Sequence, residues 1–69
     1  MNNKITPEVA RDLLSDKMNS RLISFRLQYL MLKDPDWLVR LAETEMKCER
    51  TEDAIAVLVD NRMNHLYKK

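Results

Sequence analysis

The chain has 69 residues, of which 12 are basic and 11 acidic, with one histidine, one cysteine and no glycine. A single cysteine excludes a disulfide within the chain, and Cys48 and His65 alone offer too few nitrogen and sulfur ligands for a structural zinc site. Sheet turns usually need glycine, whereas Leu, Met, Ala, Lys, Arg and Glu favour helices, so the composition predicts one small all-α domain over residues 1–69.

The first predicted helix covers residues 7–33. It begins at Thr6-Pro7-Glu8, where a capping threonine precedes a proline suited to the first turn and an acid suited to the positive end of the helix dipole. The apolar residues then keep helical steps of three and four, through Leu14, Met18, Leu22, Phe25, Tyr29 and Leu32. We therefore expect one long helix, while the polar residues 15–17 and 19–20 leave open a division into two.

Two shorter helices are predicted over residues 35–49 and 52–67. Because a proline disfavours helical geometry in the residue before it, Pro35 ends the first helix near Lys33, and Asp34-Pro35-Asp36 becomes a hinge. Thr51, followed by two acidic residues, marks the third helix start.

The segment 41–58 resembles one hairpin of the tetratricopeptide repeat. Leu41 and Ala42 match its first helix, whereas Ala54, Ile55 and Leu58 match the start of its second, and Glu49 replaces the usual turn glycine. The resemblance implies that residues 35–67 form an antiparallel helix pair, and therefore that the chain is a three-helix unit.

Residues 21–33 carry two apolar faces when placed on a helix at about 100° per residue. One face holds Leu22, Phe25, Tyr29 and Leu32, and the other holds Ile23, Leu27, Leu30 and Met31. Two partner helices within the chain could cover both faces. Alternatively, one face contacts another chain, since an exposed apolar face is a liability without a partner. We expect the contact on the second face, with Arg26 and Lys33 at its rim.

Positive charge is concentrated in the later half of the first predicted helix. Lys17, Arg21, Arg26 and Lys33 lie there without an acidic residue between them. An alternative function follows, in which these four residues contact phosphates and the protein is a nucleic-acid-binding regulator of transcription or replication. Glu52 and Asp53 would repel phosphates from the start of the last helix, which makes a helix-turn-helix reading less favourable.

Few residues suggest catalysis. His65 lies near a helix end, where a cation suits the dipole, and Cys48 shares a stripe with Trp37 and Leu41, which predicts a buried hydrophobe. No glycine-rich loop is present to hold a phosphate. We therefore expect no enzyme activity, no cofactor and no metal.

Together these features predict a small non-catalytic protein-binding regulator, inhibitor or adaptor. We expect it to be a homo-oligomer, such as a homodimer, and to contact another protein as well. No membrane span is expected because no apolar run of about 18 residues is present. The lone thiol and the polar N-terminus fit the cytoplasm, and a short reading frame from Met1 is typical of a bacterial, plasmid or phage protein.

Overall fold

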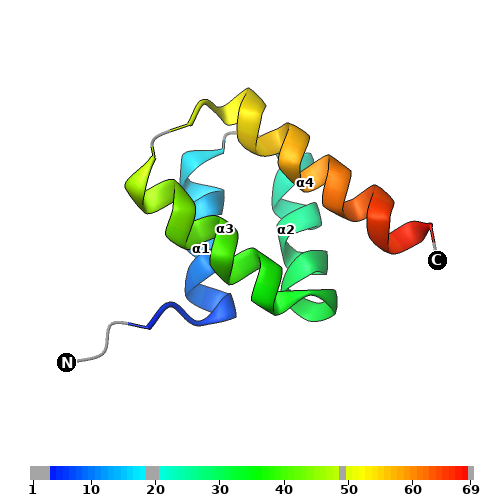
Figure 1. Ribbon diagram of the computed structural model, residues 1–69, viewed down its shortest axis with the longest axis horizontal. Coiled ribbons are helices and arrows are strands. Elements are labelled where there is room, and N and C mark those ends of the chain that lie inside the picture. The colour runs from blue at the N-terminus through cyan, green and yellow to red at the C-terminus, as the bar shows by residue number, and fades with distance from the viewer. Residues whose placement is uncertain (1–3, 19–20, 49, 69) are drawn as a thin grey trace.

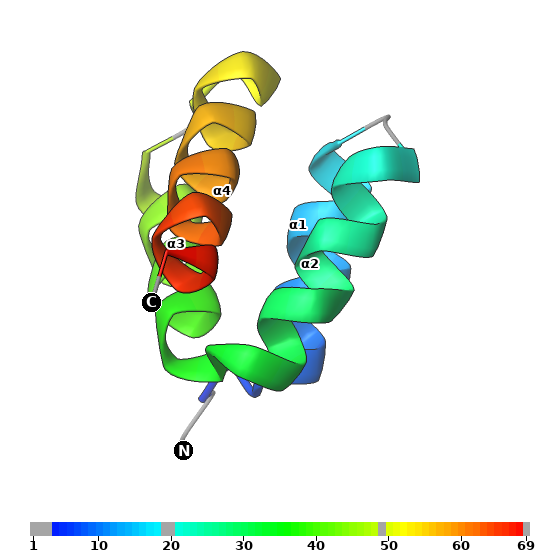
Figure 2. The ribbon, with the colours of Figure 1, turned by 90° about the vertical axis from the view of Figure 1, so that its right-hand side faces the viewer.

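The computed structural model is all-α and describes residues 4–18, 21–48 and 50–68. In that part of the chain, four helices follow one another: α1 (Pro7–Lys17), α2 (Arg21–Lys33), α3 (Pro35–Lys47) and α4 (Glu52–Tyr67) (Figure 1). A second view shows two layers, with α1 and α2 on one side and α3 and α4 on the other (Figure 2). The predicted fold class is confirmed, whereas the arrangement of the helices differs from the prediction.

Three helices begin at the residues where the sequence predicts a start. The Thr6 hydroxyl accepts a hydrogen bond from the Val9 N–H at 3.2 Å, and Thr51 caps α4 in the same way from the Ala54 N–H at 3.2 Å. Asp34 precedes α3 without a capping bond from its side chain. Its carboxylate instead accepts a hydrogen bond from Arg62 Nε on α4, at 2.5 Å.

The single helix predicted over residues 7–33 is wrong, because the chain forms two helices there. At Met18 the backbone is extended, with φ −107° and ψ 135°, and its N–H donates to the Ser15 carbonyl at 3.2 Å. Residues 19 and 20, which the sequence offers as a break point, lie outside the described residues. The division allows α1 to pack against α2, which a continuous rod would prevent.

The break also changes the apolar phase. α1 and its C-cap bury Ala10, Leu14 and Met18, and α2 then buries Ile23, Leu27 and Leu30. The step across the break is therefore from residue 18 to residue 23, five positions, rather than the four expected of an unbroken helix. This shift turns the stripe of Leu22, Phe25 and Leu32 outward.

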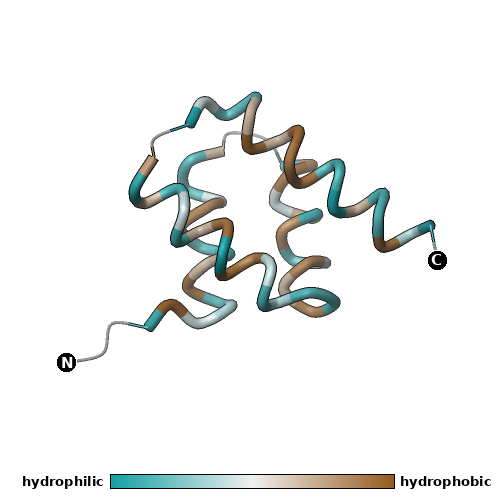
Figure 3. Tube along the Cα trace, in the orientation of Figure 1, coloured by the Kyte–Doolittle hydropathy of each residue, from teal (hydrophilic) through white to brown (hydrophobic). Residues whose placement is uncertain are grey.

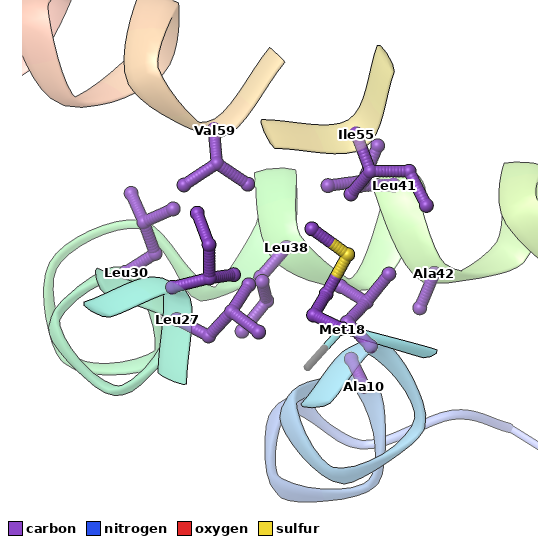
Figure 4. Packing of buried hydrophobic residues seen from close by; sticks show 11 residues of the cluster. Ala10, Met18, Leu27, Leu30, Leu38, Leu41, Ala42, Ile55 and Val59 are labelled. Carbon is purple, nitrogen blue, oxygen red and sulfur yellow. The ribbon is translucent and has the colours of Figure 1, made fainter. Parts of the chain in front are cut away.

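All four helices contribute to the core. Along each helix, hydrophobic stretches alternate with hydrophilic ones, as amphipathic helices require (Figure 3). Ile55 and Val59 point from α4 toward the core side chains of α2 and α3 (Figure 4). The buried apolar residues are Ala10, Leu14, Met18, Ile23, Leu27, Leu30, Leu38, Leu41, Ala42, Ile55 and Val59.

The helical hairpin expected over residues 35–67 is not a closely packed helix pair in the structure. The chain does reverse direction between α3 and α4 (Figure 1). However, α3 packs mainly on α1 and α2, whereas α4 packs mainly on α2, and α3 and α4 approach each other less closely. The division of the first predicted helix adds a separate helix, α1, and α3 packs more extensively on α1 than on α2 or α4.

Cys48 is exposed, which corrects its predicted place in the core. Helix α3 ends at Lys47, so Cys48 is its C-cap and leaves the stripe of Trp37 and Leu41. In the part of the chain that the structure describes, no helix combines the length and hydrophobicity needed to cross a membrane.

Candidate binding surface

Three of the four apolar residues predicted to contact another chain lie inside this one. Leu27 and Leu30 are fully buried and Ile23 is 5% exposed. Met31 is half-buried, with its sulfur 3.5 Å from Arg11 Nη1 on α1. A contact through this face would require the fold to open, so the face is not available to another chain while the protein is folded.

That opposite face is exposed and apolar. Leu22, Phe25 and Leu32 are 57%, 72% and 68% exposed. Tyr29, which lies between Phe25 and Leu32 in the sequence, is half-buried. Their steps of three, four and three residues place all four side chains on one side of the helix. An exposed patch of this kind on a small protein typically marks an interaction surface.

The last turn of α4 extends this surface. Tyr67 stacks on Tyr29, with ring centroids 5.8 Å apart and ring planes inclined by 24°, and it remains largely exposed. We call the outer face the five residues Leu22, Phe25, Tyr29, Leu32 and Tyr67.

Polar residues border the outer face where α2 meets α4. Arg26 pairs with Asp60 across the two helices. A hollow of about 440 Å³ lies there, lined by Arg26, Asp60, Met63, Asn64 and Tyr67. An apolar centre with a polar rim is the usual anatomy of a protein–protein interface.

The four basic residues of the alternative function do not form one stripe. Lys17 donates from its ammonium to the Glu45 carbonyl on α3 at 3.4 Å, and Arg26 is paired with Asp60. Arg21 and Lys33 are exposed but begin and end α2, so their backbones are about 18 Å apart along the helix. A row of adjacent phosphates along α2 would therefore find no unpaired arginine or lysine between Arg21 and Lys33.

Lys33, predicted as a rim residue with Arg26, is exposed beside Leu32 at the end of α2. The sequence pattern identifies both faces of α2, but it cannot tell which one is internal, because that depends on the break near residue 18. Tyr67 is not among the surface residues predicted from the sequence, because its contact with Tyr29 joins residues 38 positions apart. No local pattern signals that pairing.

The candidate catalytic residues do not form a buried site. Both Cys48 and His65 are exposed. No group of three or more His, Cys, Asp or Glu side chains within the described ranges could hold a metal ion. No family model, curated protein or solved structure matches this chain.

Proposed function

We propose that the protein is a small non-catalytic regulator or adaptor that binds other proteins, and that it self-associates through the outer face of α2. The observation that carries the proposal is the 72% exposure of Phe25, an aromatic side chain, at the middle of an apolar helix face. The protein has a single cysteine, Cys48, whose exposed thiol cannot form a disulfide within the chain. A free thiol of this kind suits a reducing compartment such as the cytoplasm.

The spacing of the outer face favours a second copy as its occupant. Leu22, Phe25, Tyr29 and Leu32 follow the a and d positions of a helix–helix seam. In a two-fold symmetric dimer the same patch serves both chains, so a self-complementary apolar face is sufficient for association.

The charges near the outer face permit this pairing. Arg26 is neutralised by Asp60, so no unpaired charge of these two residues faces the centre. Arg21 and Lys33 lie at opposite ends of α2. At the crossing angle of about 20° that a and d spacing favours, these two residues stay at the ends of the seam, where their side chains reach solvent and the repulsion between like charges is screened.

Self-association would also stabilise a short chain. A 69-residue domain buries only roughly 60% of its unfolded surface and is correspondingly marginal. With no disulfide possible within the chain, oligomerisation is one of the few remaining ways to add buried apolar area.

The test is sedimentation equilibrium of the wild-type chain and two outer-face variants, Phe25→Asp and Leu32→Asp. The wild type should have at least twice the 8.2 kDa mass of one chain, and both variants should be monomers. Because both side chains are exposed, neither variant should lose helix content by circular dichroism. Leu27→Asp would be unsuitable, since Leu27 is fully buried and its replacement would disrupt the fold.

A matched control is Val57→Asp, which places the same charge at an exposed apolar residue of α4 outside the outer face. This variant should keep the mass of the wild type. A wild type that remains a monomer at high concentration, or a Val57→Asp variant that dissociates as fully as Phe25→Asp, would overturn the proposal.

A further inference from the structure

A groove between α3 and α4 collects three arginines around a tryptophan. It has a volume of about 390 Å³, and its lining includes Trp37, Arg40, Thr44, Arg50, Leu58 and Arg62. It shares no residue with the outer face of α2. We call it the arginine groove. Its size lies within the range of small-molecule sites, about 300–1,000 Å³.

Two of the arginines are held in place by acidic partners. Arg62 donates through Nε to Asp34, and its guanidinium carbon lies 5.9 Å from the centre of the Trp37 ring. Arg50 Nη1 lies 3.3 Å from Oε2 of the buried Glu45. Each pair uses only part of a guanidinium, which carries five N–H donors.

Arg40 is the unpaired member of the set. It is exposed and forms no ion pair with any residue in the described part of the chain. Its backbone carbonyl accepts a hydrogen bond from the Thr44 hydroxyl at 2.9 Å. Asp34 and Glu45 each pair with one arginine, so Arg40 is the lining arginine that has no ion pair within the described residues.

The apolar part of the groove lies beside these charges. Leu41 and Leu58 line it together with the Trp37 indole. A second hollow of about 250 Å³ shares Trp37, Leu58 and Arg62 and reaches Asn61 and His65. The groove therefore offers guanidinium donors next to an aromatic and aliphatic surface.

We propose that the arginine groove binds a phosphate group carried by an aromatic ring, which is the chemistry of a nucleotide. Arg40 and the free donors of Arg62 hold the phosphate, because guanidinium matches phosphate oxygens in a planar, bidentate geometry. The base lies against Trp37 and Leu58, where stacking and apolar contact tolerate any base. The phosphate comes from a free nucleotide or from a single nucleic-acid strand, two sources with the same local chemistry.

Trp37 is the only tryptophan of the chain, so its fluorescence reports directly on the groove. The experiment titrates the protein with ADP, adenosine, inorganic pyrophosphate and a short oligothymidylate. ADP should change the fluorescence saturably, pyrophosphate should bind more weakly, and adenosine should not bind. An oligothymidylate that binds more tightly than ADP identifies a nucleic-acid strand as the source, and one that binds no more tightly identifies a free nucleotide.

Two variants locate the binding. Arg40→Ala should weaken ADP binding by about tenfold, the effect of losing a charge-assisted hydrogen bond. Lys47→Ala removes the same charge from an exposed residue of the same helix outside the groove, so its affinity should stay within about twofold. The Phe25→Asp variant should bind ADP like the wild type, which separates this site from the proposed self-association.

Three results would overturn the proposal. The first is the absence of a saturable change with either ADP or oligothymidylate. The second is an equal loss of affinity in Arg40→Ala and Lys47→Ala, which would indicate non-specific charge attraction. The third is adenosine binding as tightly as ADP, which would leave the arginines without a role.

Discussion

Arg62 is a single side chain that ties α4 to the junction of α2 and α3. Its guanidinium reaches Asp34, the residue between those two helices, and also lies near the face of Trp37. These contacts matter because α3 and α4 approach each other less closely than the other neighbouring helices. The position of α4 therefore depends on side chains such as Arg62 as well as on the core residues Ile55 and Val59.

We expect Arg62→Ala to lower the free energy of unfolding by about 1–2 kcal/mol, since it removes a part-buried ion pair and a cation–π contact together. Urea denaturation measures the change. Asp34→Asn, which removes only the charge of the partner, should cost less, about 0.5–1 kcal/mol. The exposed Arg21 provides the control, and an Arg62→Ala effect no larger than that of Arg21→Ala would show that these contacts add no stability.

Glu45 is a buried carboxylate at the end of α3, only 2% exposed. Its Oε1 accepts a hydrogen bond from the backbone N–H of Arg50 at 3.3 Å, and its Oε2 lies 3.3 Å from Arg50 Nη1. Oε2 has no geometrically acceptable hydrogen bond among the described residues, so the ion pair is the favourable contact that the structure gives it. A buried charge with one partner depends strongly on that partner.

Arg50→Ala should therefore destabilise the protein by about 1–3 kcal/mol, because it leaves the Glu45 carboxylate buried without its counter-ion. Glu45→Gln removes that charge, so Arg50→Ala should cost much less in a Glu45→Gln background. The four proteins form a double-mutant cycle, measured by chemical denaturation. Strictly additive effects would mean that the two side chains are not coupled.

Helix α2 shows how one element can carry two apolar faces with different roles. Its inner face joins the core, whereas its outer face lies opposite and is exposed. Each face has four apolar or aromatic residues in the sequence, so the number of such positions does not distinguish them.

Matched truncations on the two faces should separate these roles. Leu27→Ala should cost about 2–5 kcal/mol, because Leu27 is fully buried and its loss leaves a cavity. Leu32→Ala should change the stability of the dilute chain by less than about 0.5 kcal/mol, since Leu32 is 68% exposed. Thermal unfolding at low protein concentration provides both values. Equal costs for the two substitutions would contradict the assignment of inner and outer faces.

The sequence could predict where helices start but not how the first long segment divides. Threonine and proline act locally, within one turn, so Thr6, Pro35 and Thr51 correctly locate three helix starts. The break near Met18 involves neither glycine nor proline in the sequence. It is favoured instead by long-range packing, because it brings Leu14 and Met18 into one cluster with Leu27 and Leu38.

The wrong prediction of one unbroken helix also explains why the exposed face of α2 was predicted incorrectly. An unbroken helix keeps Leu22 and Phe25 in phase with Leu14 and Met18, which favours a buried role for them and an exposed role for Leu27 and Leu30. With the break, those roles exchange. The residue types on each face were therefore predictable, whereas their orientation required the tertiary fold.

The whole molecule is a two-layer unit with a small core, and its stability should depend on concentration if the outer face pairs two copies. Binding that requires the folded state stabilises that state by mass action. For a dimer that unfolds to separate chains, raising the concentration from about 5 µM to about 500 µM should raise the Tm by roughly 5–10 °C in a domain of this size.

Differential scanning calorimetry over that concentration range measures the shift, with Phe25→Asp and Val57→Asp as companions. Phe25→Asp should unfold at one temperature at every concentration, because it lacks the contact. Val57→Asp should follow the wild type, since it leaves the outer face intact. If the wild-type Tm were also independent of concentration, the four-helix unit would be stable as a single chain, and the proposed self-association through the outer face would be wrong.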